Sequence, residues 1–499
     1  MSTVDMSRVD FDDIQGLVRY GYRKLTQASF LLLRVRDPAS ARAWLARCPV
    51  SSAREQSPPP RTVLQVALTC PGLRALGVNE DIVQGFSREF LAGMSSDDAR
   101  SRRLGDLGAN APARWQWGGQ PQSPPHLMLM LYAWPGELEA WQHQILDQCS
   151  AGFDLLHCLT TSDMDGVEPF GFADGISQPT LDWERNRPVR DEDVLDYSNL
   201  SCLGEYLLGY PNEYGEYSDR PLLRDELDPD GGLPRAEESP ELADLGRNGS
   251  YLVLRQLHQD VAGFWRYVDA AVKGDAAQRE QLAAAMVGRS RDGLPLAGGA
   301  SEAIEGEDDP LNSFTYLHDR RGERCPIGAH IRRSNPRNAD LPPGGHGLIA
   351  RLMRTLGFDA QALEDDRVSS TRFHRLLRRG REYGEGLSPE QALAGQDTTG
   401  QGTGLHFICL GASIARQFEF VQGAWIAGTH FSTLHNESDP LLGNRLPGPD
   451  GEPTDGFSMP TEGGCDLHRA GLPQFVRVVG GAYFFLPGIR ALRYLAKEP

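Results

Sequence analysis

Three short stretches of the sequence carry residue types that could act together on one bound group. Residues 325–337 read Cys-Pro-Ile-Gly-Ala-His-Ile-Arg-Arg-Ser-Asn-Pro-Arg and place one histidine, His330, among arginines and turn-forming residues. Residues 171–175 read Gly-Phe-Ala-Asp-Gly, and residues 376–380 read Leu-Leu-Arg-Arg-Gly. Haem iron takes a neutral imidazole as a ligand and cations near its two propionates. Together, the stretches could supply an iron ligand, an acid and a cation to one cofactor.

Each stretch has a plainer explanation when it is taken alone. A lone histidine is more often a hydrogen-bonded structural residue than a metal ligand. Asp174, between its glycines, suits the cap of a turn, although such glycines also let the backbone approach a flat or bulky group closely. The arginines around Arg378 suit a solvated basic patch. His330 as ligand, with Arg332 or Arg333 near a propionate, therefore depends on the combination.

The composition argues against several classes of function. The chain has 499 residues, 40% of them hydrophobic and 24% charged, and a net charge of −18. Such a charge opposes binding to nucleic acid and to anionic membrane surfaces. No apolar run approaches the ~18 residues of a membrane helix. The N-terminus lacks a basic segment followed by an apolar run, so we expect no signal peptide and a cytoplasmic location.

The eight cysteines are scattered along the chain. They form neither a CxxC pair nor the CxxCH motif that attaches haem covalently. We expect reduced, mostly buried thiols rather than disulfides or a zinc site. Any haem would therefore be held non-covalently.

Two segments far apart in the sequence share one pattern. Residues 29–35 form a short apolar run that predicts a buried strand, and residues 250–255 repeat it. A helical pattern follows each run, and the first begins at Asp37-Pro38, a favourable helix start. Aligned without a gap, five positions are identical: Ser29/Ser250, Leu31/Leu252, Leu33/Leu254, Arg34/Arg255 and Trp44/Trp265.

A second pair of segments supports an internal duplication. Residues 127–133 and 405–410 are both apolar, and each precedes a helical pattern. Two copies of such a unit predict two α+β domains with antiparallel sheets and helices on one face. We expect the domains at 1–180 and 247–499, joined by an acidic connector or surface excursion at 181–246. A helical insertion is expected at 341–370.

The motifs together resemble those of the dye-decolorizing peroxidases, a family of haem enzymes. The resemblance rests on residues 13–16 (Asp-Ile-Gln-Gly), on the GxxDG motif at 171–175 extended to Gln178-Pro179, and on 329–337. It continues through 377–380, 404–408, 416–422 and 481–487, in the family's order and across almost the whole chain. GxxDG alone is moderately specific, whereas the full set is highly specific. The long intervening segments are similar to those of the larger family members.

The resemblance implies a fold and a set of site residues. The fold would be a tandem of two ferredoxin-like α+β domains, with haem b in the second domain. His330 would be the proximal iron ligand, Asp174 the distal acid and Arg378 the distal arginine. The remaining residues expected at the cofactor are Gly175, Ile176, Gln178 and Phe407, with Arg332 at a propionate.

The resemblance also implies an activity. The protein would use hydrogen peroxide to oxidise bulky dyes, phenolics or other organic reductants through a high-valent haem iron. An ionised Asp174 could move a proton from the inner to the outer peroxide oxygen. Arg378 would keep Asp174 ionised and stabilise the charge that develops on the leaving oxygen. A homo-oligomer is left open.

Two assignments and three other functions remain as alternatives. Arg379 could replace Arg378 as the distal arginine. Some family members place an acid behind the proximal histidine, where this chain has Gln474, and an amide there would donate less electron density. The protein could instead be a haem carrier or sensor without turnover, or a chlorite dismutase-like or deferrochelatase-like haem enzyme. A metal hydrolase built on His330 and Asp174 ranks last, since no HExxH spacing occurs.

Overall fold

A computed structural model describes residues 9–119, 124–186, 199–298, 309, 311–316, 318–337, 371–396, 402–448, 450–461 and 463–497. Its first half alternates strands and helices in the order β1 (Gln27–Val35), α1 (Pro38–Leu45), β2 (Thr62–Leu68), β3 (Leu127–Ala133), α6 (Leu138–Cys149) and β4 (Phe153–Thr160). Four short helices between β2 and β3 are α2 (Cys70–Ala75), α3 (Glu80–Val83), α4 (Arg88–Ala92) and α5 (Asp98–Leu104).

The second half repeats this order. It runs through β9 (Ser250–Gln259), α7 (Val261–Ala271), α8 (Ala276–Val287), α9 (His330–Ser334), β10 (Leu377–Arg378), β11 (Arg381–Tyr383), α12 (Pro389–Leu393), β12 (Gly404–Gly411), the π-helices η8 (Ala415–Glu419) and η9 (Val421–Ile426), and β15 (Val476–Leu486). The last helix is α13 (Ile489–Leu495), and the short strands are β5 (Thr180–Leu181), β6 (Leu200–Ser201), β7 (Leu222–Leu223), β8 (Ala243–Asp244), β13 (Phe457–Met459) and β14 (Leu467–Arg469).

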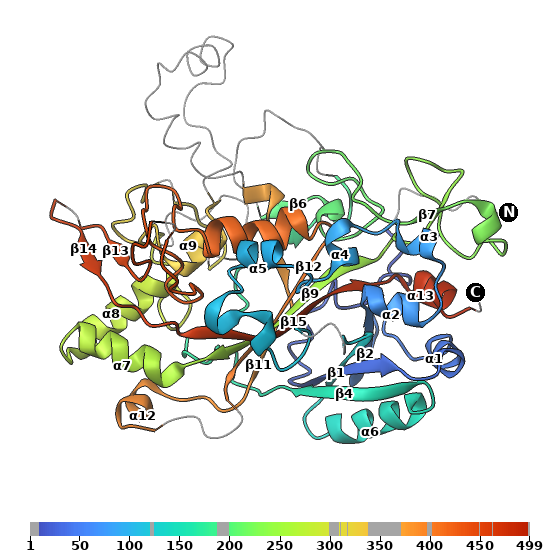
Figure 1. Ribbon diagram of the computed structural model, residues 1–499, viewed down its shortest axis with the longest axis horizontal. Coiled ribbons are helices and arrows are strands. Elements are labelled where there is room, and N and C mark those ends of the chain that lie inside the picture. The colour runs from blue at the N-terminus through green and yellow to red at the C-terminus, as the bar shows by residue number, and fades with distance from the viewer. Residues whose placement is uncertain are drawn as a thin grey trace, which may run out of the picture.

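One nine-stranded sheet joins the two halves (Figure 1). Its order is β10-β12-β9-β15-β2-β3-β1-β4, with β11 also on β12, and its pairings are antiparallel. Each half therefore has the βαββαβ order of a ferredoxin-like unit, with β1 equivalent to β9 and β3 to β12. The tandem duplication expected from the sequence is confirmed.

The equivalent helices α1 and α7 begin in the same way. Asp37 Oδ2 accepts a hydrogen bond from the Ser40 amide at 2.7 Å, and Asp260 Oδ1 accepts one from the Gly263 amide at 2.8 Å. An aspartate at this position satisfies one of the free N–H groups of a helix start. The local signal that predicted the first helix is thus the one that begins it, and the structure adds the equivalent aspartate at the start of α7.

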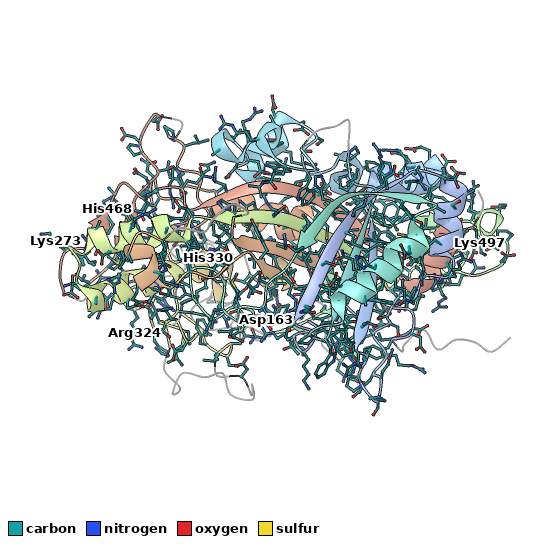
Figure 2. The ribbon with its side chains drawn as sticks, turned by 90° about the horizontal axis from the view of Figure 1, so that it is seen from below. Asp163, Lys273, Arg324, His330, His468 and Lys497 are labelled. Carbon is teal, nitrogen blue, oxygen red and sulfur yellow. The ribbon has the colours of Figure 1, made fainter. Side chains whose placement is uncertain are left out.

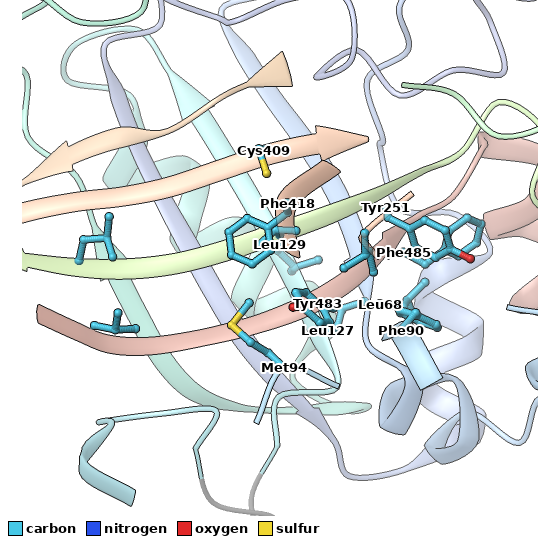
Figure 3. Close-up of a cluster of buried hydrophobic side chains, with 14 of the residues drawn as sticks. Leu68, Phe90, Met94, Leu127, Leu129, Tyr251, Cys409, Phe418, Tyr483 and Phe485 are labelled. Carbon is cyan, nitrogen blue, oxygen red and sulfur yellow. The ribbon is translucent and has the colours of Figure 1, made fainter. Parts of the chain in front are cut away.

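The sheet is buried on both faces. Successive side chains of a strand point to opposite sides, and both sets are buried here. On β1, Leu31 and Leu33 join a cluster with the helices, whereas Phe30 and Leu32 join a second cluster with the N-terminal segment. The first cluster draws on both halves, as Figure 3 shows for Leu68, Leu127 and Leu129 beside Tyr251 and Phe485. The halves therefore share a core.

Gln15, in the Asp-Ile-Gln-Gly motif, reinforces the seam between the half-sheets. The strands β15 and β2 pair only at Phe485 and Leu68. Gln15 Nε2 donates to Val66 O at 2.8 Å and to Pro487 O at 2.9 Å, and Gln15 Oε1 accepts from Val66 N at 2.8 Å. This buried side chain ties β2 to the end of β15, so the motif has a structural role.

The segment after residue 198 differs from the expectation of a surface excursion. Tyr206, Leu207, Leu208 and Tyr210 are at most 1% exposed and belong to the core clusters. A short apolar run is enough to cover one face of the sheet, although the surrounding composition is acidic and rich in turns. The expected helical insertion at 341–370 lies outside the described residues. Within the described ranges no helix is long and apolar enough to span a membrane.

Candidate active site

A cavity of about 250 Å³ lies beside the second half of the sheet. Strands β9, β12 and β15, the π-helices, α9 and the loop 168–179 all contribute to its wall. Six of the residues expected at the site line it together: Asp174, Ile176, Gln178, His330, Arg378 and Phe407. Gly175 lines a neighbouring groove instead, and Arg332 lines neither.

His330, the first residue of α9, presents its ring to this cavity. Its side chain, labelled in Figure 2, is 28% exposed and lines the cavity. Its Nδ1 lies 2.9 Å from Asp439 Oδ2. A carboxylate there fixes the ring's orientation and leaves the other nitrogen for a ligand.

The buried Asp439 carboxylate is itself held firmly. Its Oδ1 accepts from the amides of Leu441 at 2.9 Å and Leu442 at 2.8 Å. Burial alone would raise the pKa of Asp439, but His330 and Arg333 outweigh burial and lower it. Burial would also lower the pKa of His330, and Asp439 reverses that effect. The Asp439 carboxylate therefore makes the His330 ring more basic and favours a proton on Nδ1.

Gln474 is not the group behind the histidine. Its Nε2 donates to Asn110 Oδ1 at 2.9 Å and to Val476 O at 3.1 Å. The acid comes instead from the segment after η9, at Asp439, which sequence reasoning missed. The two residues are 109 positions apart, and no short spacing links them; the only local signal is an aspartate that precedes a proline and two leucines.

Asp174 and Arg378 form the opposing polar pair. Arg378 Nη1 donates to Asp174 Oδ1 at 3.0 Å, and Nη2 donates to Ser177 O at 3.2 Å. Burial would raise the pKa of Asp174, but the Arg378 guanidinium and the Gly175 amide hold that pKa below its ordinary value. Asp174 is therefore ionised at neutral pH.

Gln178 fixes the distance between the acid's loop and the arginine's strand. Its Oε1 accepts from the Arg378 amide at 3.0 Å, and its Nε2 donates to Arg378 O at 3.1 Å. Arg379 points elsewhere, because its guanidinium donates to Leu17 O at 2.8 Å and Val18 O at 2.9 Å. The geometry thus favours Arg378 over Arg379 as the partner of Asp174.

Arg332, which was expected at a propionate, does not line the cavity. Its guanidinium donates to Asp319 Oδ2 at 3.2 Å and to Cys325 O at 2.6 Å, behind the wall of the cavity. Two other arginines line the cavity and meet at Ser177, whose Oγ accepts from Arg289 at 2.9 Å and from Arg337 at 3.1 Å. Burial and the nearby Arg337 lower the pKa of Arg289 to about 10.

The wall and the donor set together fit haem. Paired buried cations favour an anionic ligand, such as two propionates. Aromatic and aliphatic side chains make up much of the remaining wall, among them Leu257, Phe407, Phe418, Val421 and Ile426. A single imidazole with a carboxylate behind it is a typical axial ligand of haem iron. Among the described residues no cluster of three or more His, Cys, Asp or Glu side chains could hold a bare metal ion.

A second, open groove reaches the polar pair from the outside. It has a volume of about 1440 Å³ and shares Asp174, Ile176, Gln178 and Arg378 with the cavity. Asp174 and Arg378 therefore stand between the surface groove and the cavity that holds His330. A small oxidant entering by this route meets the acid first.

Comparison with known proteins gives the same picture. The chain is 28% identical to the "Multifunctional dye peroxidase DyP2" of an Amycolatopsis species, over 87% of this chain and 82% of that protein. It is also 28% identical to the "Dye-decolorizing peroxidase AauDyP1" of Auricularia auricula-judae, over 98% of this chain and 87% of the relative. No protein-family model matches the chain.

Solved structures agree in fold. A dye-decolorizing peroxidase in complex with 2,6-dimethoxyphenol superposes with a TM-score of 0.72 at 22% identity, covering 98% of this chain and all of that one. An Auricularia auricula-judae dye-decolorizing peroxidase gives 0.70 at 24% identity, with the same coverage. Fold and site together define an oxidoreductase of the peroxidase class. Within that class, the chain is similar to the dye-decolorizing peroxidases over almost its whole length.

Proposed function

We propose that the protein uses hydrogen peroxide to oxidise organic reductants, dyes and phenolics among them, with haem b bound non-covalently at His330. The observation that carries this proposal is the position of the Asp174–Arg378 pair. It lines the cavity that His330 also lines, and it borders the groove that opens to the surface. An ionised acid beside a cation is the arrangement that splitting a peroxide requires.

The anchoring residues divide into three groups. His330 would hold the iron through the ring nitrogen that does not contact Asp439, and Asp439 would keep the ring oriented. Arg289 and Arg337 would bind the propionates, a role first expected of Arg332. Phe407 and the other apolar side chains of the wall would pack against the macrocycle. Bound haem supplies the iron at which peroxide is reduced and stores two oxidising equivalents.

Asp174 would handle the proton. The carboxylate accepts a proton from the peroxide oxygen nearer the centre of the cavity and returns it to the outer oxygen, which leaves as water. Arg378 contributes twice, because it keeps Asp174 ionised before the transfer and stabilises negative charge on the departing oxygen afterwards. Ser177 O and the Gln178 side chain hold Arg378 in place for both tasks.

A cytoplasmic location stays a prediction, and a homo-oligomer stays open. A bulky dye is larger than the cavity, so we expect it to be oxidised from the surface, whereas peroxide reaches Asp174 directly.

The absorption spectrum of the haem-loaded protein, before and after one equivalent of hydrogen peroxide, tests the proposal. We expect a ferric Soret band that changes on peroxide addition and recovers when a dye or phenol is added. A Soret band that ignores peroxide would make the protein a haem carrier or sensor. The lack of any Soret band after incubation with haemin would show that the protein does not bind haem.

A further inference from the structure

A second carboxyl group lines the cavity, on the same loop as Asp174. Glu168 precedes the GxxDG motif and lines the cavity. Its Oε2 accepts from the Phe170 amide at 3.0 Å, and its Oε1 accepts from the Phe172 amide at 3.1 Å. Both oxygens are thus used to hold the loop that ends in Asp174.

The loop is also fixed from its other side. Phe170 packs on Phe264 of α7 with ring centroids 4.7 Å apart, and Phe172 lies parallel to Trp265 at 6.4 Å. The Glu168 amide donates to Phe172 O at 2.8 Å. Because the rings are held by α7 and the amides by the carboxyl group, the position of Asp174 depends on Glu168.

Gln259 of β9 gives this carboxyl group a partner in either protonation state. Its Nε2 donates to Glu168 Oε2 at 2.8 Å. Its Oε1 is buried and has no hydrogen-bond partner in the part of the chain that the structure describes. A half-turn of the amide would bring Oε1 to a protonated Glu168, where it could accept a hydrogen bond from the added proton.

We propose that Glu168 is a second acid of the active site, which holds the Asp174 loop in place and reversibly takes up a proton beside it. The inference rests on the proposed peroxidase function for its chemical purpose, but its geometry does not. Glu168 acts through Asp174 and is a positioning residue rather than the group that touches peroxide.

The charges around Glu168 support reversible protonation. Burial raises its pKa to about 7, the amides of Phe170 and Phe172 and the Gln259 side chain oppose that rise, and the Asp174 charge adds to it. Besides Glu168 and Asp174, the ionisable groups that line the cavity are Arg255, Arg289, Tyr316, His330, Arg337, His374, Arg375 and Arg378. Arg291 also reaches the loop, because its Nε donates to Gly171 O at 3.2 Å. Near neutral pH the site therefore holds one firm carboxylate and one that titrates.

The test is an infrared pH titration of the purified haem-loaded protein, which reads the carbonyl stretch of protonated carboxyl groups from about pH 5 to about pH 9. The wild type should show a component with a midpoint near pH 7 that Glu168→Gln removes. Asp174→Asn should keep that component and move its midpoint to lower pH, because a neighbouring negative charge is gone. Burial also raises the pKa of Glu205 to about 7, so this residue, which does not line the cavity, should persist as an internal reference.

Hydrogen exchange tests the positioning role. The amides of Phe170 and Phe172 should exchange about tenfold faster in Glu168→Gln, because the amide group offers only one acceptor oxygen. A titration amplitude near pH 7 that is as large in Glu168→Gln as in the wild type, or a midpoint of the Glu168 component that Asp174→Asn leaves unmoved, would overturn the proposal. If Glu168→Gln fails to fold, the Asp174→Asn midpoint decides alone. The peroxide response of the same samples is read separately by visible absorption, so a failure of the peroxidase assignment would not be mistaken for a failure of Glu168.

Discussion

The two halves of the sheet share one topology but differ in what covers it. In the first half the α-helix α6 follows β3, and its Ile145 is fully buried in the core. In the second half the π-helices η8 and η9 follow β12, and they turn Phe418, Val421 and Ile426 toward a cavity. A π-helix is rare and frequently marks a functional site. The duplicated unit thus kept a filled core in one copy and became hollow in the other.

The difference shows which features of a repeat are free to change. The strands and the aspartate-capped first helix are shared, because they set the sheet and its hydrophobic faces. The helix after the third strand and the segment that carries α9 are not shared, and they contribute the ligand and the wall. The first half supplies the loop with Glu168 and Asp174, so the site is completed only where the copies meet.

The largest expected effect is the loss of haem from the hollow half. His330→Ala should abolish stable haem binding, since the axial ligand is gone. His157→Ala, at a half-buried position on β4 of the filled half, is the matched control and should bind haem like the wild type. The measurement is the ratio of Soret to protein absorbance after gel filtration. Full occupancy in His330→Ala would refute the axial assignment.

The next largest effect is expected at Asp174, the acid that the first half contributes to the site. Asp174→Asn should retain haem but slow the peroxide-induced absorbance change by about 10²- to 10⁴-fold, the usual contribution of a general acid–base residue. Stopped-flow mixing with peroxide measures the rate. Arg379→Lys is the control, because its guanidinium points away from Asp174. A normal rate in Asp174→Asn would remove that residue from proton transfer.

A smaller effect on haem affinity and activity is expected at Asp439, the hydrogen-bond partner of His330. Asp439→Asn should weaken haem affinity or peroxidase activity by about ten- to a hundredfold, as is typical when the hydrogen-bond partner of a metal ligand is replaced. Gln474→Ala should change neither, since Gln474 contacts Asn110 and not His330. Equal effects of the two substitutions would show that the histidine does not depend on Asp439.

The pH dependence should reveal the charge pair. Arg378 lowers the pKa of Asp174 against the effect of burial. In Arg378→Leu only the Gly175 amide and His330 still oppose the effect of burial, so the pKa of Asp174 rises. Asp174 is active when ionised, and the acid side of the rate profile should therefore move to higher pH by about one to three pH units. An unmoved acid side would mean that another group sets it.

The smallest effect separates filled from hollow packing. Ile145→Ala in α6 should lower the free energy of unfolding by about 2–5 kcal/mol. Ile426→Ala in η9 should cost less in the haem-free protein, because its side chain already borders empty space. The difference between the two costs in free energy of unfolding should become smaller once haem fills the cavity. Urea unfolding of both variants, with and without haem, measures it; equal costs without haem would contradict the comparison.

Much of this arrangement could be predicted from local patterns. The repeated apolar runs and the Asp37 cap predicted the paired strands and first helices, because these depend on residues close in sequence. The positions of His330, Asp174 and Arg378 around one cavity followed from motifs. The features that could not be predicted depend on contacts between residues that are not linked by a sequence motif. Asp439 is 109 residues from its partner His330. Arg332 binds Asp319, and no sequence pattern indicates that contact.

Composition misled in one further place. The acidic, turn-rich segment after residue 198 hid Tyr206 and Tyr210, which cover the face of the sheet opposite the helices. An average over a long window dilutes a five-residue apolar run, although such a run is enough to bury one patch of strand.

The Gln178 clamp on Arg378 has a consequence beyond catalysis. Strand β10 lies at the end of the sheet, and the Arg378 N–H and C=O that Gln178 binds are the groups a further strand would use. Unpaired edge groups of this kind invite another chain to add on and start aggregation. The Gln178 side chain therefore occupies the backbone groups that an added strand would need. We expect a substitution of Gln178 to lower solubility as well as turnover.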